Sequence, residues 1–445
     1  MTAKMTTIKA DAPPGGFKQT EIGLIPEEWG ISSIGSLFEI QQGKALSARN
    51  QTGKSPRPFL RTANVFWGRL DLNTVDSMDF TDQEAERLSL RVDDLLVCEG
   101  GDIGRTAIWR GEIEGCSYQN HIHRLRAKDT NVEPLFYMYW MQAAMLLFRL
   151  YGGEGNKTTI PNLSKARLST FQIPTPPLPE QRTIAHVLSK IQATAQAQAA
   201  IAERARELKR ALMAKLFTEG LRGEPLKETG IGPMPESWQI AHLSELAHFK
   251  NGINFSRDQK GSGILTVDVL NMYSDSIQVE MGNLYRVNIN LKDDYRLQSN
   301  DILLVRSSLK QAGVGWPALF TGYSEPVTFC GFLIRARLTS MEVHPIFLLY
   351  YLRLPATRAM LVSKSGKVAI TNINQGNLGT VPIPMPPLNE QQEIARILQT
   401  VDAKFAAAER KRAGLEELFR AMLGELMRGS VRVTGLADRL SGVLA

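Results

Sequence analysis

The sequence predicts an α+β protein with two mixed α/β domains in an internal duplication, joined by two long antiparallel coiled-coil helices. Two observations predict this class. A set of motifs occurs twice, about 210 residues apart, and about 40 residues with heptad-spaced apolar side chains follow each copy. The chain has 445 residues, of which 43% are hydrophobic and 22% are charged. This length and composition provide enough core for two or three domains.

The duplication rests on motifs that match in the same order. The segment IGLIPEEW at residues 22–29 returns as IGPMPESW at residues 231–238, an offset of 209. The segment IPTPPLPEQ, which begins at Ile173, returns as IPMPPLNEQ from Ile383, an offset of 210. A period this long is far beyond that of solenoid repeats and indicates a duplicated domain, with a pseudo-two-fold axis as the expected arrangement.

The two copies differ most in one region. Residues 44–90 and 253–299 share almost nothing beyond length, although Gly43 and Gly252 match just before them. We therefore expect a constant frame that carries two different variable inserts.

Each copy begins with short β-type segments and one apolar helix. The expected strands are Ser36–Gln41, Asp94–Cys98, His121–Arg126, Asp301–Val305 and Phe332–Arg337, and the expected helices begin at Pro134 and Pro345. The predicted boundaries are an N-terminal arm at 1–16, domain 1 at 17–178, helix 1 at 179–223, domain 2 at 224–388, helix 2 at 389–430 and a C-terminal tail at 431–445.

The two long helices follow proline-rich segments. Because proline cannot continue a strand ladder or a helix interior, we interpret these segments as stiff, extended lead-ins. At about 1.5 Å per residue, each helix is roughly 60 Å long and must bury its apolar stripe. Packing of the two helices on each other, with the domains held apart at opposite ends, is favoured over a partner-binding or homodimeric coiled coil. The residues expected to pack the helix pair are Ile184, Leu188, Ile191, Leu212, Leu216, Ile394, Leu398, Val401, Phe405, Leu415, Phe419, Met422 and Leu426.

Composition limits the function classes. The chain has 52 Lys and Arg against 45 Asp and Glu, a net charge of +7 that fits a polyanionic partner without proving one. Cys98, Cys116 and Cys330 are far apart and odd in number, so we interpret them as small buried residues of a reducing compartment. No export signal or membrane segment is recognisable, and the cytoplasm is the expected location.

The common catalytic motifs do not match. A phosphate-binding loop needs glycine directly before its lysine, where Asn156 stands, and the second candidate has Val368 in place of the magnesium-binding Ser or Thr. His121 and His123 with Cys116 lack an evident fourth metal ligand, so packing or phosphate contact is the favoured role and no metal site is expected. We interpret the chain as a binding protein and not as an enzyme.

The repeated I-x-x-x-P-x-x-W starts and the I-P-x-P-P-L-x-E-Q-x-x-I-A-x-x-L boxes at Ile173–Leu188 and Ile383–Leu398 supply a family resemblance. Together with the heptad helices, they resemble the specificity subunit of a bacterial type I restriction–modification enzyme, over residues 17–433. The resemblance implies two target-recognition domains, each of which reads one half of a bipartite site in double-stranded DNA, and spacer helices that act as a ruler.

The resemblance also implies partners and their cofactors. The helices dock two modification (methyltransferase) subunits, which carry S-adenosylmethionine and methylate adenine. Restriction (translocase and nuclease) subunits add ATP- and Mg-dependent cleavage, while no cofactor is expected in this chain.

Arg, Lys, Asn and Gln side chains in loops suit phosphate contact and base readout. The candidate DNA-binding residues are Gln41, Gln42, Lys44, Arg49, Arg61, Asn64, Asn156, Lys157, Thr158, Lys250, Asn251, Asn254, Arg257, Arg306, Lys310, Lys364 and Lys367. Because the frames match and the inserts differ, the target is expected to be split and asymmetric, with half-sites about one turn of DNA apart, roughly 34–36 Å.

Two alternatives remain open from the residues alone. A coiled-coil scaffold without DNA recognition predicts partner binding that is insensitive to salt and to substitution of the loop lysines. A concealed enzyme requires an acid–base pair in the Ser/Thr-rich loops or near Glu99, yet the second copy has Arg306 at the position of Glu99.

Overall fold

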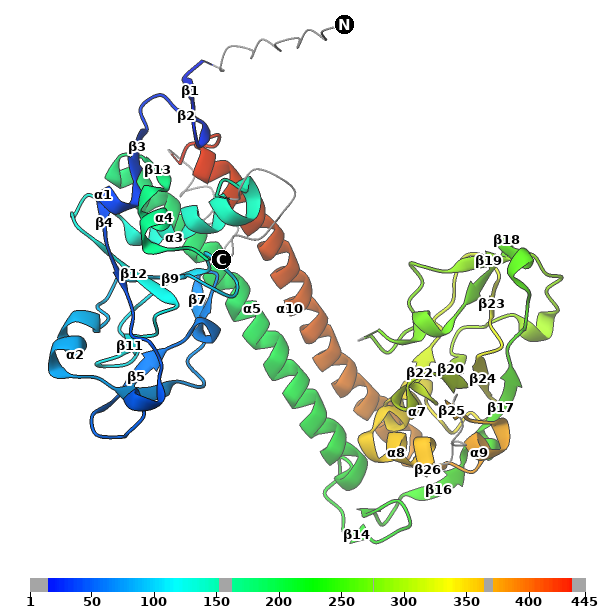
Figure 1. Ribbon diagram of the computed structural model, residues 1–445. Coiled ribbons are helices and arrows are strands. Elements are labelled where there is room, and N and C mark those ends of the chain that lie inside the picture. The colour runs from blue at the N-terminus through cyan, green and yellow to red at the C-terminus, as the bar shows by residue number, and fades with distance from the viewer. Residues whose placement is uncertain (1–14, 152–161, 275, 364–370, 434–445) are drawn as a thin grey trace, which may run out of the picture. The chain divides into compact units, whose positions relative to one another are not determined.

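The computed structural model describes residues 15–151, 162–274, 276–363 and 371–433 (Figure 1). The chain divides into two compact units: unit 1 comprises Met1–Gln198 and Lys411–Ala445, and unit 2 comprises Ala199–Arg410. The long helices α5 (Leu178–Glu219) and α10 (Leu388–Arg428) are each divided between the two units, with one part in unit 1 and the other in unit 2.

Unit 1 contains strands and helices in alternation. Its strands are β1 (Phe17–Thr20), β2 (Gly23–Pro26), β3 (Gly30–Ser33), β4 (Phe38–Gln42), β5 (Pro56–Leu60), β6 (Val65–Phe66), β7 (Arg69–Leu70), β8 (Asp76–Asp79), β9 (Leu95–Cys98), β10 (Thr106–Ile108), β11 (Ser117–Tyr118), β12 (Ile122–Ala127) and β13 (Gln172–Thr175). Its helical segments, besides its parts of α5 and α10, are α1 (Ile34–Leu37), η1 (Ala48–Asn50), η2 (Thr62–Asn64), α2 (Asp82–Leu88), α3 (Pro134–Ala143), η3 (Ala144–Phe148) and α4 (Lys165–Thr170).

Unit 2 repeats this order. Its strands are β14 (Leu226–Lys227), β15 (Met234–Pro235), β16 (Gln239–His242), β17 (Ala247–Asn251), β18 (Lys260–Val267), β19 (Tyr285–Val287), β20 (Ile302–Val305), β21 (Ser307–Ser308), β22 (Pro317–Leu319), β23 (Val327–Phe329), β24 (Leu333–Leu338), β25 (Thr371–Asn372) and β26 (Pro382–Met385). Its helical segments, besides its parts of α5 and α10, are α6 (Leu243–Leu246), η4 (Arg257–Gln259), η5 (Val269–Met272), η6 (Asp293–Tyr295), η7 (Gln311–Gly313), α7 (Pro345–Arg353), α8 (Pro355–Ser363) and α9 (Gln375–Gly379).

The two units share the topology of their four-stranded and three-stranded sheets. A four-stranded sheet has the order β10-β9-β12-β4 in unit 1 and β22-β20-β24-β17 in unit 2. A three-stranded sheet has β5 parallel to β11 and antiparallel to β8, and β18 is likewise parallel to β23 and antiparallel to β19. The inserts at 44–90 and 253–299 therefore follow one backbone plan that their unrelated sequences do not reveal.

The inner strands β9 and β20 of the four-stranded sheets are buried on both faces. Leu95 and Val97 of β9 face the core that includes α3 and the long helices, whereas Leu96 and Cys98 face the core beneath the three-stranded sheet. This division follows from the alternation of side chains along a strand. Unit 2 repeats it, with alternate residues of β20 in separate cores.

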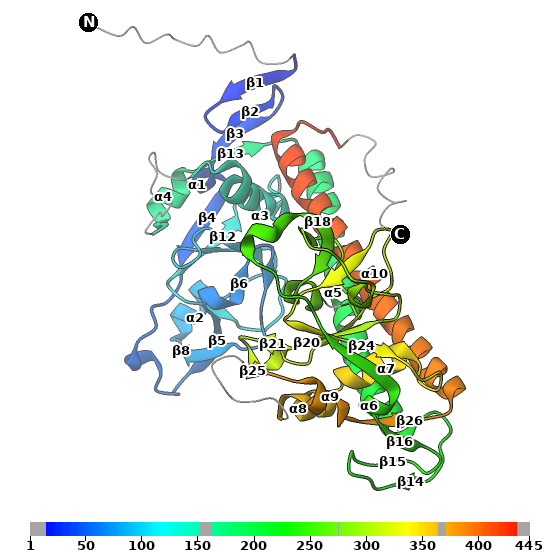
Figure 2. The same ribbon diagram turned by 90° about the vertical axis from the view of Figure 1, so that its right-hand side faces the viewer.

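The proline-rich segments before the long helices are strands. Residues Gln172–Thr175 pair antiparallel with β3, and Pro382–Met385 pair in the same way with β16 (Figure 2). The segments are extended, as predicted, but the prediction that proline keeps them out of a strand ladder was wrong. Each ladder has only two strands, and proline is tolerated at such an edge because its missing N–H can point away from the partner.

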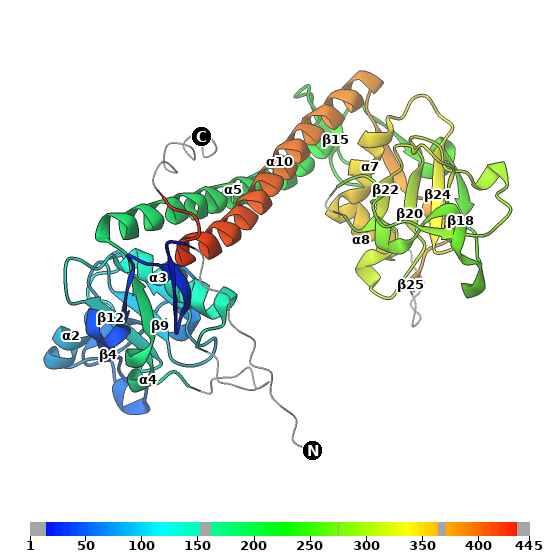
Figure 3. The same cartoon turned by 90° about the horizontal axis from the view of Figure 1, so that it is seen from above.

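The long helices pair antiparallel, as predicted (Figure 3). In unit 1 the first part of α5 packs with the last part of α10, and in unit 2 the last part of α5 packs with the first part of α10. Of the residues expected to pack the pair, those that are buried are Ile184, Leu188, Ile191, Leu216, Ile394, Leu398, Val401, Leu415 and Leu426, and those that are partly buried are Leu212, Phe405, Phe419 and Met422.

A glutamate in the first turn of each long helix ties that helix to the segment just past the end of the other. The Glu180 carboxylate accepts a hydrogen bond from the Trp29 indole at 3.0 Å and pairs with Arg432 at 3.1 Å. Glu390 accepts from the backbone N–H of Leu221 at 2.9 Å and pairs with Arg222 at 3.3 Å. This contact, which we call the glutamate lock, thus joins the start of one long helix to the segment after the other in both units.

Cys98, Cys116 and Cys330 are free and buried, which confirms their interpretation as buried residues. Burial raises the pKa of each thiol to about 12. Within the described ranges, no helix is both long enough and apolar enough to cross a membrane.

Candidate DNA interface

One end of the four-stranded sheet gathers the variable loops in each unit. In unit 1, His123 of β12 lies opposite Gln42 of β4 and Val97 of β9 in antiparallel registers. Strands β4 and β9 therefore end where β12 begins, and we call this edge the loop end. In unit 2, β17 and β20 end and β24 begins at the corresponding loop end.

Polar side chains converge at the loop end of unit 1. The Gln42 amide donates hydrogen bonds to the Glu99 carboxylate at 2.8 Å and to the Asn120 carbonyl at 3.0 Å. The His123 imidazole lies 3.9 Å from Glu99 and 2.8 Å from the Leu163 carbonyl oxygen. Burial lowers the pKa of His123 and keeps its ring neutral, so His123 holds backbone in place and the packing interpretation agrees with its surroundings.

The loop end of unit 2 carries different side chains on the same frame. The Asn251 amide oxygen accepts a hydrogen bond from Gln375 at 3.0 Å. Arg306 follows β20, at the position that Glu99 has after β9, and its N–H donates to the Phe332 carbonyl at 2.7 Å. Its guanidinium reaches the Gly331 carbonyl at 3.4 Å. A carboxylate in one unit is thus replaced by a cation in the other.

The repeated glycine lies at this edge in both units. A Cβ atom at Gly43 would overlap the Tyr118 carbonyl oxygen, and one at Gly252 would overlap the Cys330 carbonyl oxygen. The close approach of two backbones explains why both copies have glycine at this position.

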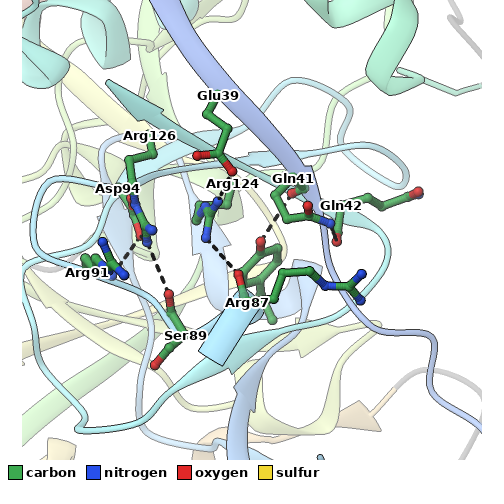
Figure 4. Close-up of polar contacts among 10 residues, drawn as sticks. Glu39, Gln41, Gln42, Arg87, Ser89, Arg91, Asp94, Arg124 and Arg126 are labelled. Atoms are coloured by element: carbon green, nitrogen blue, oxygen red, sulfur yellow. Dashed lines mark hydrogen bonds and ion pairs between the residues drawn. The ribbon is translucent and has the colours of Figure 1, made fainter. Parts of the chain in front are cut away.

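Buried aspartates form ion pairs at the opposite end of each four-stranded sheet, where β9 and β20 begin and β12 and β24 end. The Asp94 carboxylate, 1% exposed, accepts bonds from Arg126 Nε at 2.8 Å and Nη2 at 2.6 Å, and it raises the pKa of Arg126 (Figure 4). Asp301 and Arg337 repeat this bidentate pair at 2.7 Å for both bonds. These pairs were not predicted from the sequence, although both partners recur in the second copy, at offsets of 207 and 211 residues.

Arg124 of β12 contacts two neighbouring segments of unit 1. Its guanidinium donates to Glu39 at 2.8 Å and to the Arg87 carbonyl at 3.1 Å (Figure 4). Arg335 of unit 2 donates in a similar way to the Asp294 carbonyl at 2.8 Å. These arginines link the four-stranded sheet to the segment that carries the insert.

Two predicted DNA-binding residues of unit 1 are committed to the fold. Lys44 is 13% exposed, pairs with Glu84 at 2.6 Å and lowers the pKa of that carboxyl. Asn64 is 7% exposed, and its amide bonds three backbone groups of its own turn, those of Arg61, Asp71 and Thr74. Both contacts favour a structural role.

The other described candidates of unit 1 are exposed or partly buried. Gln42, Arg49 and Arg61 are exposed, Gln41 is partly buried, and Arg61 pairs with Asp76 at 2.7 Å. Candidates Asn156, Lys157 and Thr158 lie outside the described residues.

In unit 2, Asn254, Arg257 and Lys310 are exposed, whereas Asn251 and Arg306 are partly buried. Lys250 is partly buried too, since it pairs with Asp294 and lies 4.3 Å from the centre of the Tyr295 ring. Candidates Lys364 and Lys367 lie outside the described residues. The structure thus brings Asn251, Arg306 and Lys310 together with the loop end, as it does Gln42 in unit 1.

No group of three or more His, Cys, Asp or Glu side chains in the described part of the chain could hold a metal ion. The candidate ligand Cys116 instead lies with its thiol 3.5 Å from the Ser117 carbonyl. The loop ends therefore offer hydrogen-bonding groups and cations for recognition, which is the chemistry of a polar binding surface.

The fold and its loop ends define a class, a duplicated two-domain binding protein built on a helix pair. The chain belongs to the type I restriction modification DNA specificity domain family, whose model matches residues 26–205 and 235–417.

Relatives match over nearly the whole chain. The type I restriction enzyme MjaVIII specificity subunit of Methanocaldococcus jannaschii is 23% identical, over 94% of this chain and 97% of that protein. The type I restriction enzyme EcoBI specificity subunit of Escherichia coli is 22% identical, over 93% of this chain and 88% of that protein. The crystal structure of a type I restriction–modification S subunit from M. genitalium shares the fold with a TM-score of 0.57 at 15% identity, over 89% of this chain and 96% of that one.

Proposed function

We propose that the chain is the DNA-specificity subunit of a type I restriction–modification complex, in which each unit reads one half of an asymmetric, bipartite target in double-stranded DNA. The observation that carries the proposal is the pair of loop ends. One frame carries Gln42, His121 and a buried Glu99 in unit 1 but Asn251, Arg306 and Phe332 in unit 2.

Different side chains on one frame select different bases. Arg pairs with guanine and Asn or Gln pairs with adenine in the major groove, whereas Glu accepts from cytosine. A target with two unlike halves follows from this difference. Catalysis, S-adenosylmethionine, ATP and Mg belong, in this proposal, to the modification and restriction subunits.

The helix pair serves as spacer and as docking surface for two methyltransferase subunits. Its inward stripe is buried within each unit, which removes the main reason to propose a free coiled-coil scaffold. Ile201 and Leu208 of α5 are 46% and 50% exposed, and their spacing of seven residues places them on one helix face. An exposed apolar pair of this kind suits a partner subunit.

The test is a domain exchange. Residues 21–178 are replaced by those of another family member with a known target, in the complex with the methyltransferase subunits, and the methylated motif is read. We expect one half of the motif to change and the other half and the spacing to persist. A change in both halves contradicts modular reading, and a motif that ignores the exchange contradicts the assignment of unit 1 to recognition.

A further inference from the structure

The loop end of unit 2 exposes three large apolar side chains. Leu270 is 85% exposed, Leu309 is 88% exposed and Phe332 is 57% exposed. Together with Tyr273 and Trp316, they line a hollow of about 910 Å³. Side chains of this size in contact with water lose the free energy that burial would provide, so their grouping calls for an occupant.

The hollow is continuous with the candidate DNA interface. Phe332 comes directly before β24, and its carbonyl accepts the Arg306 N–H at 2.7 Å. Leu309 comes directly after β21, and Leu270 lies in η5, which follows the end of β18. Since β18 runs parallel to β23, whose chain leads on to Phe332, all three side chains belong to the loop end.

The surroundings of the hollow favour a polyanion. Lys310 lines it and Arg306 directly precedes the lining residue Ser307, and neither cation has a carboxylate partner among the residues that the structure describes. Asp268 is the acidic residue of the lining, and its Oδ1 atom is already bonded, by the Val269 N–H at 2.7 Å and by the Cys330 thiol at 3.2 Å. A ligand that fits must combine negative charge with small apolar groups.

Among the residues that the structure describes, the corresponding surface of unit 1 lacks this character. His121 stands before β12 where Phe332 stands before β24. Asn64 and Asn271 make the same bonds in η2 and η5, and they align Ala63 with Leu270. The apolar loop end is therefore confined to unit 2, and what it contacts is expected in one half of the target only.

We propose that Leu270, Leu309 and Phe332 contact thymine 5-methyl groups in the major groove of the half-site that unit 2 reads. The thymine methyl is the apolar group that the edges of base pairs present there, and the phosphates beside it match Arg306 and Lys310. This inference rests on the proposed function, because it requires that the loop end meets DNA.

The test replaces thymine by deoxyuridine, which removes the methyl group and leaves base pairing intact. The complex of this chain with its methyltransferase subunits is titrated at fixed salt with duplexes that carry its target, in which one half-site at a time contains deoxyuridine. We expect about fourfold weaker binding for each contacted methyl, in one half-site only, which is the fold-change for one buried methyl group.

Variants assign the effect to the hollow. Leu309→Ala and Leu270→Ala remove exposed side chains, so the fold is expected to persist, and each variant should discriminate less between thymine and deoxyuridine duplexes than the unchanged chain does. The matched control is Met341→Ala, because Met341 is 90% exposed in unit 2 but follows β24 at the opposite end of the sheet. This control should keep the full discrimination.

Three results overturn the inference: equal binding of thymine and deoxyuridine in both half-sites, discrimination that is undiminished in both leucine variants, or a unit 2 half-site of G·C pairs alone. In each of these cases the complex still binds its target specifically. The same result is expected if the hollow binds another protein instead of DNA. Failure of the proposed function is a separate result, because the thymine duplex itself would then bind no better than unrelated DNA.

Discussion

Asp93 and Asp94, the two residues just before β9, form two different kinds of ion pair. Asp94 is buried and bonded twice by Arg126, whereas Asp93 and Arg110 form a half-exposed pair at 2.7 Å. Removal of one partner of a buried pair leaves the other charge without compensation, which costs about 3 kcal/mol or more. Exposed pairs contribute about 0–1 kcal/mol.

We therefore expect Asp94→Asn to lower the free energy of unfolding by about 3 kcal/mol, measured by urea denaturation. The control is Asp93→Asn, which keeps a residue that tolerates the positive φ of 72° at this position and should cost less than about 1 kcal/mol. Equal losses in the two variants would show that the buried pair has no special role.

His123 gives the fold a pH dependence. Burial depresses its pKa below the ordinary 6.5. The unfolded chain therefore takes up a proton near pH 6.5 that the folded chain refuses, so stability is full above this pH and falls as the pH is lowered through it. Thermal unfolding at pH 7.5 and 5.5 should show a smaller loss on acidification for His123→Gln than for the unchanged chain. An unchanged difference would contradict this role.

Single residues of the interface were only partly predictable. Loop polarity singled out Arg306 and Lys310 as candidates, but it could not distinguish them from Lys44, which pairs with Glu84, or from Asn64, which bonds nearby backbone groups. Leu309 was missed, because an apolar residue in a loop has no pattern until the fold places it beside Phe332.

At the scale of elements, the long helices derive their stability from the stripe that they bury on each other. Leu398 is 0% exposed, while Leu208 on the facing helix is 50% exposed. Leu398→Ala leaves a cavity and should lower the free energy of unfolding by about 3 kcal/mol. The measurement is the loss of helical circular dichroism on heating. Leu208→Ala should change stability by less than about 0.5 kcal/mol. If the two variants melt alike, the buried stripe is not what holds the pair.

The helix pair was predictable because heptad spacing is a local signal that repeats over many turns. The three-stranded sheets were not predictable, because their strands are short and lie in segments without alternation or mutual similarity. Their common order appears only through pairing, as in the parallel contact of β5 with β11 and of β18 with β23. The strand role of Ile173–Thr175 was missed because proline argues against a ladder.

At the scale of the molecule, duplication is the central fact. Both units repeat one topology, the buried Asp–Arg pair and the glutamate lock at the helix ends. What differs is the loop end, where Glu99 of unit 1 corresponds to Arg306 of unit 2, and His121 corresponds to Phe332. A frame that is kept while its exposed edge changes is the design of a modular reader.

The measurement that tests this account most directly is a map of adenine methylation across the genome of a host that expresses this chain together with its neighbouring methyltransferase gene. The account predicts a new motif with two unlike halves and a fixed gap, which vanishes when this chain is omitted. Association of the two proteins without any new methylation would contradict the account and favour a scaffold role.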